Sequence, residues 1–282
     1  MSIITLTTDY GLKDHFVGAL KGKILSDYAE ARIVDISHDI DPFNTAEASY
    51  VIGAAYQSFP QGTVHLVGVD AERNKENGHI AMQWNGHFFV CADNGIPGML
   101  TQKIVPEKIV SINIHDRLPE QSTDLDVFVK VACHIARGGL LNVIGKETDS
   151  IKKPTEIQPV VASDKNSIKG YVIYVDHLGN IVTNITKKLF TETAKGRDYE
   201  IVLNPRAKQP SKANIKKIYS RYSDIAGSTS YPIKNYEGTK LALFNEAGFL
   251  EIAIFRSNPF TVGTAASLLG LGYRDVITIN FT

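Results

Sequence analysis

The sequence has no excess of charge of either sign and no long apolar segment. Its 282 residues contain 30 Lys and Arg against 30 Asp and Glu, which gives a formal net charge of +0. A nucleic-acid-binding protein needs a basic excess or stripe to collect phosphates, so this balance argues against nucleic acid as a partner. No uncharged apolar run reaches the roughly 18 residues of a membrane-spanning helix, so we expect no membrane span.

Motifs for metal and phosphate binding are also absent. The two cysteines, Cys91 and Cys133, lie in apolar runs without CxxC spacing, which favours small buried side chains over zinc ligands or a redox pair. The histidines show no HExxH spacing. The first turn reads TTDYGLKDH instead of GxGxxG or GxxxxGK, which argues against a nucleotide held through its pyrophosphate. We therefore expect no metal and no cofactor.

The N-terminal segment, MSIITLTTDYG, differs from a secretory signal peptide. It has neither a basic start nor a long apolar stretch, and it ends in a polar turn. This pattern predicts a first β-strand and a cytoplasmic protein.

The first half of the chain alternates strand-like and helix-like segments. Helical spacing of apolar residues covers 14–28 and 45–59, and Asp14 is placed to cap the first of these helices. The strand-like runs are 2–7, 32–37 and 63–70. Such alternation is typical of a largely parallel sheet that is covered by helices, which places the protein in the α/β class.

Composition divides the chain into two domains. The pair Asn85-Gly86 between HIAMQW and HFFVCA predicts a hairpin near the end of the first domain. A stretch rich in Lys, Pro, Ser, Thr and Asp then predicts a linker at 151–168, between domains at 1–150 and 169–282. Short strand-like runs separated by Gly and Asn turns predict that the second domain is a smaller antiparallel β-barrel.

Acidic residues follow several of the predicted strands. Asp9, Asp70 and Asp176 each come at the end of a β-rich run. In an open α/β sheet, ligands collect outside the carboxyl ends of the strands, and a carboxylate can accept hydrogen bonds from both vicinal hydroxyls of a ribose. The simpler alternative is that each Asp caps a helix or shapes a turn. Pattern alone therefore indicates an α/β ligand-binding protein.

Four motifs extend this interpretation. The segments TLTTDYGLKDHFVGALKG, VDISHDIDPFN, ADNG and VDHLGNIVTNI resemble the S-adenosyl-L-methionine hydroxide adenosyltransferase family, which also includes fluorinases and chlorinases. The similarity runs in order through nearly the whole chain and ends with NEAGFLEIAI and TAASLLGLG. It implies an N-terminal α/β domain, a smaller C-terminal β-barrel domain, and a homotrimer that binds an adenosine-containing small molecule between subunits.

The resemblance also implies a set of ligand-binding positions. They are Asp9, Asp14, Phe43, Asp176, Asn180 and Ala265. Asp9 matches the Asp that holds the ribose hydroxyls, and Asp14 matches the acidic group that meets the methionine ammonium. Phe43 matches an aromatic residue in the wall of the ligand site, and Asp176 matches an Asp at the amino-acid end of the ligand. Asn180 matches an Asn at the adenine, and Ala265 matches a position whose backbone contacts the adenine edge. Carboxylates suit an ammonium and a diol, and an amide suits adenine.

Two motifs depart from the pattern of the hydrolytic members. These enzymes carry VDPGVGTxR and FHGRD, and are thought to position and activate water with the Asp, Arg and His. Here the first motif reads VDAERNKEN, so Asp70 remains and Asn77 replaces the Arg. The second reads STDLD, with Thr123 in place of the His. Arg73 is near enough in sequence to substitute, so the predicted catalytic residues are Asp70, Arg73 and Thr123.

These observations leave two main functional hypotheses. The first is a hydrolase in which water attacks the ribose C5′ of S-adenosyl-L-methionine and releases adenosine and L-methionine, with Asp70 orienting the water. The second is a non-catalytic binder of adenosine or S-adenosylmethionine that has lost the water-activating residues. A weaker third hypothesis is a structural relic without a ligand.

Overall fold

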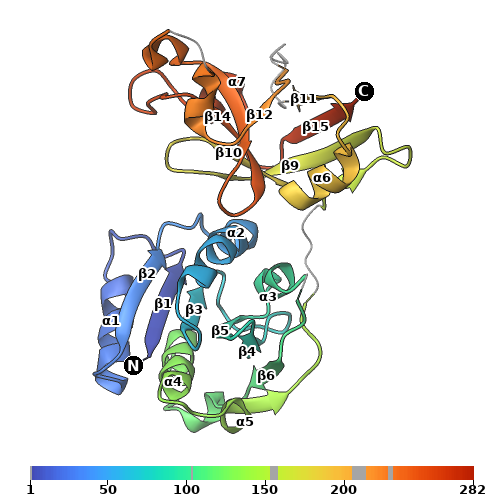
Figure 1. The fold of residues 1–282 in the computed structure, drawn as a ribbon. Helices are drawn as coiled ribbons and strands as arrows, with labels where there is room; N and C mark the ends of the chain where they lie inside the picture. The colour runs from blue at the N-terminus through green and yellow to red at the C-terminus, as the bar shows by residue number, and fades with distance from the viewer. Residues whose placement is uncertain (1, 103, 153–157, 205–213, 228–230) are drawn as a thin grey trace. The chain divides into compact units, whose positions relative to one another are not determined.

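The chain divides into two units, Met1–Glu156 and Ile157–Thr282. The computed structural model describes residues 2–102, 104–152, 158–204, 214–227 and 231–282 (Figure 1). The predicted linker at 151–168 falls partly on residues 153–157, which lie outside the described residues. Its remainder already contains strand β8 (Val160–Val161) and the start of β9 (Ser167–Val175).

The first unit contains a seven-stranded mixed sheet with the order β2-β1-β3-β5-β4-β6-β7. Its strands are β1 (Ile3–Thr8), β2 (Arg32–Ser37), β3 (Val64–Gly68), β4 (His79–Trp84), β5 (His87–Ala92), β6 (Lys108–Ile112) and β7 (Gly145–Glu147). Strands β2, β1, β3 and β5 run parallel, whereas the pairs from β5 onward are antiparallel. The expectation of a largely parallel sheet is therefore confirmed only for the first four strands in this order.

The antiparallel part begins with the predicted hairpin. Asn85 and Gly86 join β4 to β5 with φ values of 50° and 78°. A two-residue turn of this kind needs left-handed backbone at both positions, and Asn followed by Gly adopts it most readily. The Asn-Gly prediction is confirmed.

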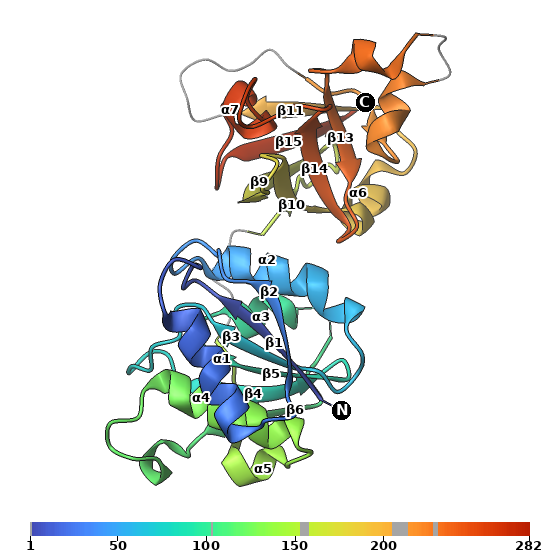
Figure 2. The same ribbon diagram turned by 90° about the vertical axis from the view of Figure 1, so that its left-hand side faces the viewer.

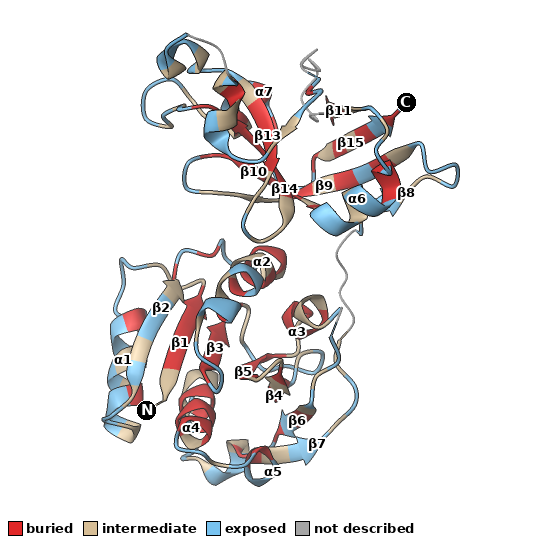
Figure 3. Ribbon diagram, viewed as in Figure 1, coloured by how far each residue is buried: buried red, intermediate tan, exposed pale blue. Residues whose placement is uncertain are grey.

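Helices cover both faces of this sheet (Figures 1 and 2). On one face lie α1 (Phe16–Asp27) and α4 (Asp124–Ala136), and on the other lie α2 (Thr45–Ala55) and α3 (Ile96–Leu100). Short helices follow α2, β6 and α4 in turn: η1 (Tyr56–Ser58), η2 (His115–Arg117) and α5 (Leu141–Ile144). Successive strand residues alternate between the two apolar layers, so β1 and β3 are buried throughout almost their whole length (Figure 3).

The first helix begins later than predicted. Its N-cap is His15, which makes no side-chain capping bond, and Asp14 lies in an exposed bend before it. The expectation that Asp14 caps this helix is wrong. Because the residues before Phe16 are not helical, Asp14 belongs to the loop that follows β1.

The second unit is a curled, almost wholly antiparallel sheet with the order β11-β15-β9-β10-β14-β13-β12, with β8 paired to β9. Its further elements are β10 (Ile181–Thr186), α6 (Lys187–Ala194), β11 (Tyr199–Asn204), β12 (Ile218–Tyr219), η3 (Tyr222–Ala226), η4 (Ile233–Tyr236), β13 (Lys240–Phe244), β14 (Phe249–Ile254), α7 (Ala265–Leu269) and β15 (Val276–Phe281). The first part of β9 pairs with β15 and the second part with β10. A bridge between Ile201 and Ile215 leads the segment before β12 back to β11, so the sheet curls toward its own first strand.

A row of buried polar side chains crosses the parallel strands of the first unit. Thr5 Oγ1 lies 2.7 Å from His65 Nδ1, and His65 Nε2 lies 3.3 Å from His87 Nδ1. The ring of His65 also stacks on Phe89, with the centroids 4.7 Å apart. Burial, with a smaller contribution from the neighbouring His87, lowers the pKa of His65 to about 3.

This burial predicts that the protein loses stability in mild acid. The folded protein keeps His65 neutral down to about pH 3, whereas the unfolded chain takes up a proton near 6.5. The contribution of His65 to the free energy of unfolding should therefore fall by up to about 1.4 kcal/mol for each pH unit between these values, and it is fully retained above pH 6.5. Urea unfolding at pH 7, 6 and 5 should show a smaller decrease in His65→Gln, which keeps an amide beside Thr5. Parallel pH dependences in the two proteins would contradict the assignment.

Candidate active site

One carboxylate joins the loops at the carboxyl ends of the parallel strands. Asp9 directly follows β1, and its Oδ2 accepts hydrogen bonds from the backbone N–H of Phe43 at 3.1 Å and of Asp70 at 3.3 Å. Both donors have left-handed backbone, with φ values of 63° and 45°. Such conformations are unfavourable for non-glycine residues and collect at functional sites. Among the described residues Asp9 Oδ1 has no partner, so it is available to a ligand.

The loop that carries Asp70 is held from a second side. The amide of Asn94, in the ADNG segment after β5, donates to the carbonyl oxygens of Val69 and Asp70 at 2.9 and 3.0 Å. Asn94 also accepts the N–H of Ile96 at the start of α3. The side chains of Asp9 after β1 and Asn94 after β5 thus hold the backbone of the loop after β3, at the sheet edge where ligands of open α/β sheets bind.

The predicted catalytic residues Arg73 and Thr123 both lie near the start of α4. The backbone N–H of Arg73 donates to Asp124 Oδ2 at 2.8 Å. Thr123 is the N-cap of α4, where its backbone N–H and hydroxyl both lie 2.8 Å from Asp126 Oδ2 in a capping box. This arrangement gives the Thr123 hydroxyl a structural partner, and a catalytic part for Thr123 stays a prediction.

A cation lies beside Asn77, the position that carries Arg in the hydrolytic motif. Lys152 Nζ donates to the Asn77 side-chain oxygen at 2.9 Å, and the Lys152 backbone N–H donates to Asp93 Oδ1 at 2.8 Å. The sequence analysis did not identify Lys152, because it lies 75 residues from Asn77.

Two histidines and an aspartate meet next to these residues, and the sequence analysis identified neither histidine. His79, at the start of β4, lies with Nδ1 3.0 Å from Nε2 of His115 in η2. Its Nε2 lies 2.9 Å from the carbonyl oxygen of Ala71 and 3.9 Å from Oδ1 of Asp124. One nitrogen from each ring and one Asp124 oxygen lie within 4.8 Å of one another. We call His79, His115 and Asp124 the histidine cluster.

Tyr10 is a further, partly buried group at this edge. Burial, and then the negative charges of Asp9 and Asp124, raise the pKa of Tyr10 to about 12. Its phenol therefore stays protonated at neutral pH and can donate a hydrogen bond. A Cβ at Gly68 would lie only 3.1 Å from the phenol oxygen, so a glycine at the end of β3 makes room for this ring.

The predicted binding residues of the second unit lie together. Asn180 donates its backbone N–H and its amide to the carboxylate of Asp176, at 2.8 and 2.9 Å. Gly179 between them has a φ of 74°, and a Cβ there would lie 2.2 Å from Thr264 Cβ. The N–H of Ala266 donates to the Gly179 carbonyl at 3.0 Å. Only glycine therefore lets this turn dock against the start of α7, where Ala265 is the first residue.

A buried carboxyl group lies near Asp176. Glu251 on β14 is 5 % exposed and accepts hydrogen bonds from the hydroxyl of Tyr222 and the amide of Asn245. Burial raises the pKa of Glu251, and the charge of Asp176 adds to the increase. The sequence analysis did not single out Glu251, because a glutamate in a strand-like run carries no motif of its own.

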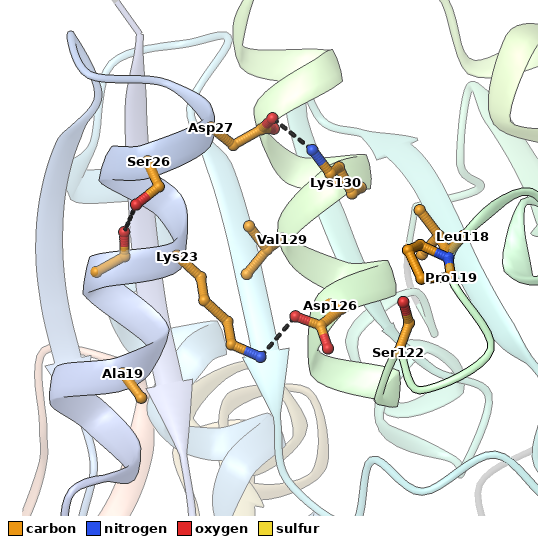
Figure 4. A pocket seen from close by; sticks show the side chains of 11 residues that line it. Ala19, Lys23, Ser26, Asp27, Leu118, Pro119, Ser122, Asp126, Val129 and Lys130 are labelled. Atoms are coloured by element: carbon orange, nitrogen blue, oxygen red, sulfur yellow. Dashed lines mark hydrogen bonds and ion pairs between the residues drawn. The ribbon is translucent and has the colours of Figure 1, made fainter.

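A groove of about 550 Å³ between α1 and α4 is a different feature (Figure 4). Two ion pairs cross it, between Lys23 and Asp126 at 2.5 Å and between Lys130 and Asp27 at 2.7 Å. None of the six predicted ligand-binding positions lines it. It is therefore a groove between two packed helices that two ion pairs cross, and it is separate from the candidate site at the strand ends.

Comparisons with known proteins identify the family of each unit. Residues 4–145 match the SAM hydroxide adenosyltransferase N-terminal domain, and residues 170–278 match the corresponding C-terminal domain. The chain belongs to this family.

Relatives of this adenosyltransferase-family protein include enzymes named as hydrolases and enzymes named as fluorinases. An (R)-S-adenosyl-L-methionine hydrolase from Methanocaldococcus jannaschii is 32% identical over 291 residues, which cover 99% of this chain and 96% of the relative. A fluorinase from Nocardia brasiliensis is 22% identical, over a match that covers 81% of this chain and 86% of the fluorinase. A crystal structure of an uncharacterized conserved protein from Thermotoga maritima superposes with a TM-score of 0.80 at 28% identity, and covers 99% of this chain and 100% of that one.

Among the described residues, no helix is both long and apolar enough to cross a bilayer.

The hydrogen bonds to Asp9 predict that two substitutions will distinguish its structural role from its role in ligand binding. Asp9→Ala leaves two backbone N–H groups without their acceptor, which should lower the free energy of unfolding by about 1–3 kcal/mol. Asp9→Asn keeps an oxygen for those donors but loses the charge, so stability should change little. Its affinity for adenosine should fall about 10- to 100-fold through weaker bonds to the ribose hydroxyls. Urea unfolding and calorimetry measure the two effects, and equal adenosine affinity in Asp9→Asn and wild type would contradict the ribose assignment.

Proposed function

We propose that the protein hydrolyses S-adenosyl-L-methionine to adenosine and L-methionine by attack of water at the ribose C5′. The observation that carries this proposal is the full-length similarity to a named (R)-S-adenosyl-L-methionine hydrolase, together with Asp9 and Asp70 at one strand edge. From the relative's name, we extend the proposal to the (R) configuration at the sulfonium as the substrate.

The chemistry suits the groups that the chain offers. A sulfonium departs as a neutral thioether, so the protein mainly has to align water with C5′ and hold the substrate. In the proposed complex, Asp9 binds the ribose hydroxyls with Phe43 beside it, Asp14 meets the methionine ammonium, and Asp70 orients the water. Asp176, Asn180 and Ala265 bind the amino-acid end and the adenine. The proposed reaction uses no organic cofactor.

The alternative is a protein that binds adenosine or S-adenosylmethionine without turnover. It is favoured by Asn77 and Thr123, which replace an Arg and a His of the hydrolytic motif, and by the engagement of the Thr123 hydroxyl with Asp126. Lys152 beside Asn77 and the nearby Arg73 weaken this argument, because each offers a positive charge in the same region.

We also propose that the active form is a homotrimer in which the half-sites of different subunits combine. The predicted binding residues fall in both units, and apolar side chains are exposed beside each half-site. Phe43, next to Asp9, is 74% exposed, and Phe260 and Val262, before Ala265, are 84% and 66% exposed. Exposed apolar groups beside a ligand site are typical of a surface that a partner covers.

Turnover tests the proposed function directly. The wild type should release adenosine and methionine from (R)-S-adenosyl-L-methionine faster than from the (S) epimer. In ¹⁸O-labelled water the label should enter the 5′-hydroxyl of adenosine. Asp70→Asn should lower kcat at least about tenfold, because the water loses its charged partner, and the matched exposed change Asp149→Asn should not. Chromatography with mass spectrometry measures each product.

The same measurement separates the alternatives. Bound adenosine without release from either epimer would establish the binder in place of the hydrolase. A 5′-halogenated product in chloride or fluoride would show that a halide, and not water, is the nucleophile.

Assembly is tested by light scattering. The proposed trimer has three times the chain mass of 31.0 kDa. Phe260→Ser should shift the protein toward monomer and weaken adenosine binding, because it places a polar group in the proposed contact. The matched change Leu140→Ser, at a position that is 67% exposed and far in sequence from either half-site, should leave the trimer intact. A wild-type monomer with full adenosine affinity would refute the assembly.

A further inference from the structure

The histidine cluster has no assigned part in the proposed reaction. Its three residues come from three elements, with His79 in β4, His115 in η2 and Asp124 in α4. The cluster is attached to the loop of the predicted catalytic residues, since the carbonyl of Ala71 contacts His79 and the N–H of Arg73 donates to Asp124. It therefore lies beside Asp70, at the edge where the substrate is proposed to bind.

The hydrogen bonds fix the tautomers of both rings. The carbonyl oxygen of Ala71 can only accept, so His79 Nε2, at 2.9 Å, carries the hydrogen and donates it. Neutral His79 then has its lone pair on Nδ1, which lies 3.0 Å from His115 Nε2. Two lone pairs would repel at this distance, so His115 Nε2 carries the hydrogen of this bond. The unprotonated nitrogen of His115 is therefore Nδ1.

This nitrogen is open to a further partner. Among the described residues none forms a hydrogen bond with His115 Nδ1, and the His115 ring is half-buried whereas His79 is only 1% exposed. His79 is held by its hydrogen bond to the Ala71 carbonyl oxygen and packs edge-on to Phe128, with ring centroids 4.5 Å apart. The buried histidine thus holds the more exposed one in a single orientation.

Burial and the charges around His115 keep its imidazole neutral, so that it can accept a proton. It faces Arg73 on the loop after β3, His79 on β4, Asp116 on η2 and Asp124 on α4. Burial and then the positive charge of Arg73 lower the pKa of His115, the neighbouring ring of His79 adds to this, and the two aspartates partly oppose it. Asp124 lies close enough to stabilise the imidazolium once it forms.

We propose that His115 is the catalytic proton acceptor for the attacking water and that His79 is its positioning residue, an inference that rests on the proposed hydrolase function. The water oxygen forms the bond to C5′ while its proton passes to His115 Nδ1. The C5′–S bond breaks and its electron pair stays on sulfur, which leaves methionine as a neutral thioether. The imidazolium then releases its proton to solvent, so the cycle balances as substrate cation plus water giving adenosine, methionine and a proton.

The first test removes basicity from His115. His115→Asn places an amide oxygen near the position of Nδ1 but has no titratable nitrogen. Its kcat should fall about 100- to 10,000-fold, which is the usual contribution of a general base, while adenosine affinity stays within a few-fold of wild type. His115→Ala should regain turnover when imidazole is added. The matched change His134→Gln, farther along α4, should leave kcat unchanged.

The second test isolates the positioning part of His79. His79→Asn keeps an acceptor near Nδ1 for the His115 N–H and should retain most of kcat. His79→Leu has a similar size but no acceptor, and should lose kcat with little change in KM. In wild type, kcat should fall in acid with an apparent pKa below the ordinary histidine value of 6.5, and this dependence should vanish in His115→Asn.

Several outcomes would overturn the proposal. Wild-type kcat in His115→Asn, or an unchanged acid limb, would exclude His115 while leaving the hydrolase intact. Loss of turnover after dialysis against EDTA, restored by Zn²⁺, would show that the cluster binds a cation instead. If the wild type releases no adenosine at all, the proposed function fails as well. Nitrogen NMR of histidine tests the tautomers without turnover, and protonated Nδ1 on neutral His115 would refute the arrangement.

Discussion

The site depends on one carboxylate oxygen that holds two unfavourable backbone conformations. Asp9 Oδ2 binds the N–H groups of Phe43 and Asp70, both of which are left-handed. These bonds bring the loops after β1, β2 and β3 to one edge. The histidine cluster depends on the same arrangement, because His79 takes its orientation from Ala71, the residue after Asp70. The hydrogen bonds of Asp9 therefore position both Asp9 itself, the proposed ribose-binding group, and the loop that contacts the proposed proton acceptor.

Much of this frame was predictable, because its signals are local. Strand runs that end in Asp9 and Asp70 indicated an edge site, and Asn85-Gly86 indicated a hairpin whose backbone the structure confirms. The direction of β6 and β7 was not predictable, since a buried run of apolar residues looks the same in a parallel and an antiparallel strand. Asp14 was misplaced as a helix cap because an acidic residue before an apolar periodicity has the same pattern in a loop.

The remaining site residues have partners that are remote in sequence. His79 and His115 are 36 residues apart, and Asn77 and Lys152 are 75 apart, so each pair exists only after the sheet has formed. Thr123 has a partner that is close in sequence. The sequence analysis considered Thr123 only as a catalytic candidate, whereas its hydroxyl and the carboxylate of Asp126 form a helix-capping box, for which Thr-x-x-Asp before an apolar run is a local signal.

The buried contact between Thr5 and His65 has a consequence for strand registration. A slip of β3 by two residues against β1 would keep every side chain on its own face, so apolar packing alone discriminates weakly against it. It would nevertheless move Asp70 about 6.6 Å from Asp9, since each strand residue advances about 3.3 Å. The same slip would separate Thr5 from His65, and both polar groups would stay buried without the hydrogen bond between them. The buried contact between Thr5 and His65 thus fixes the register of β1 and β3, and with it the relative position of Asp9 and Asp70.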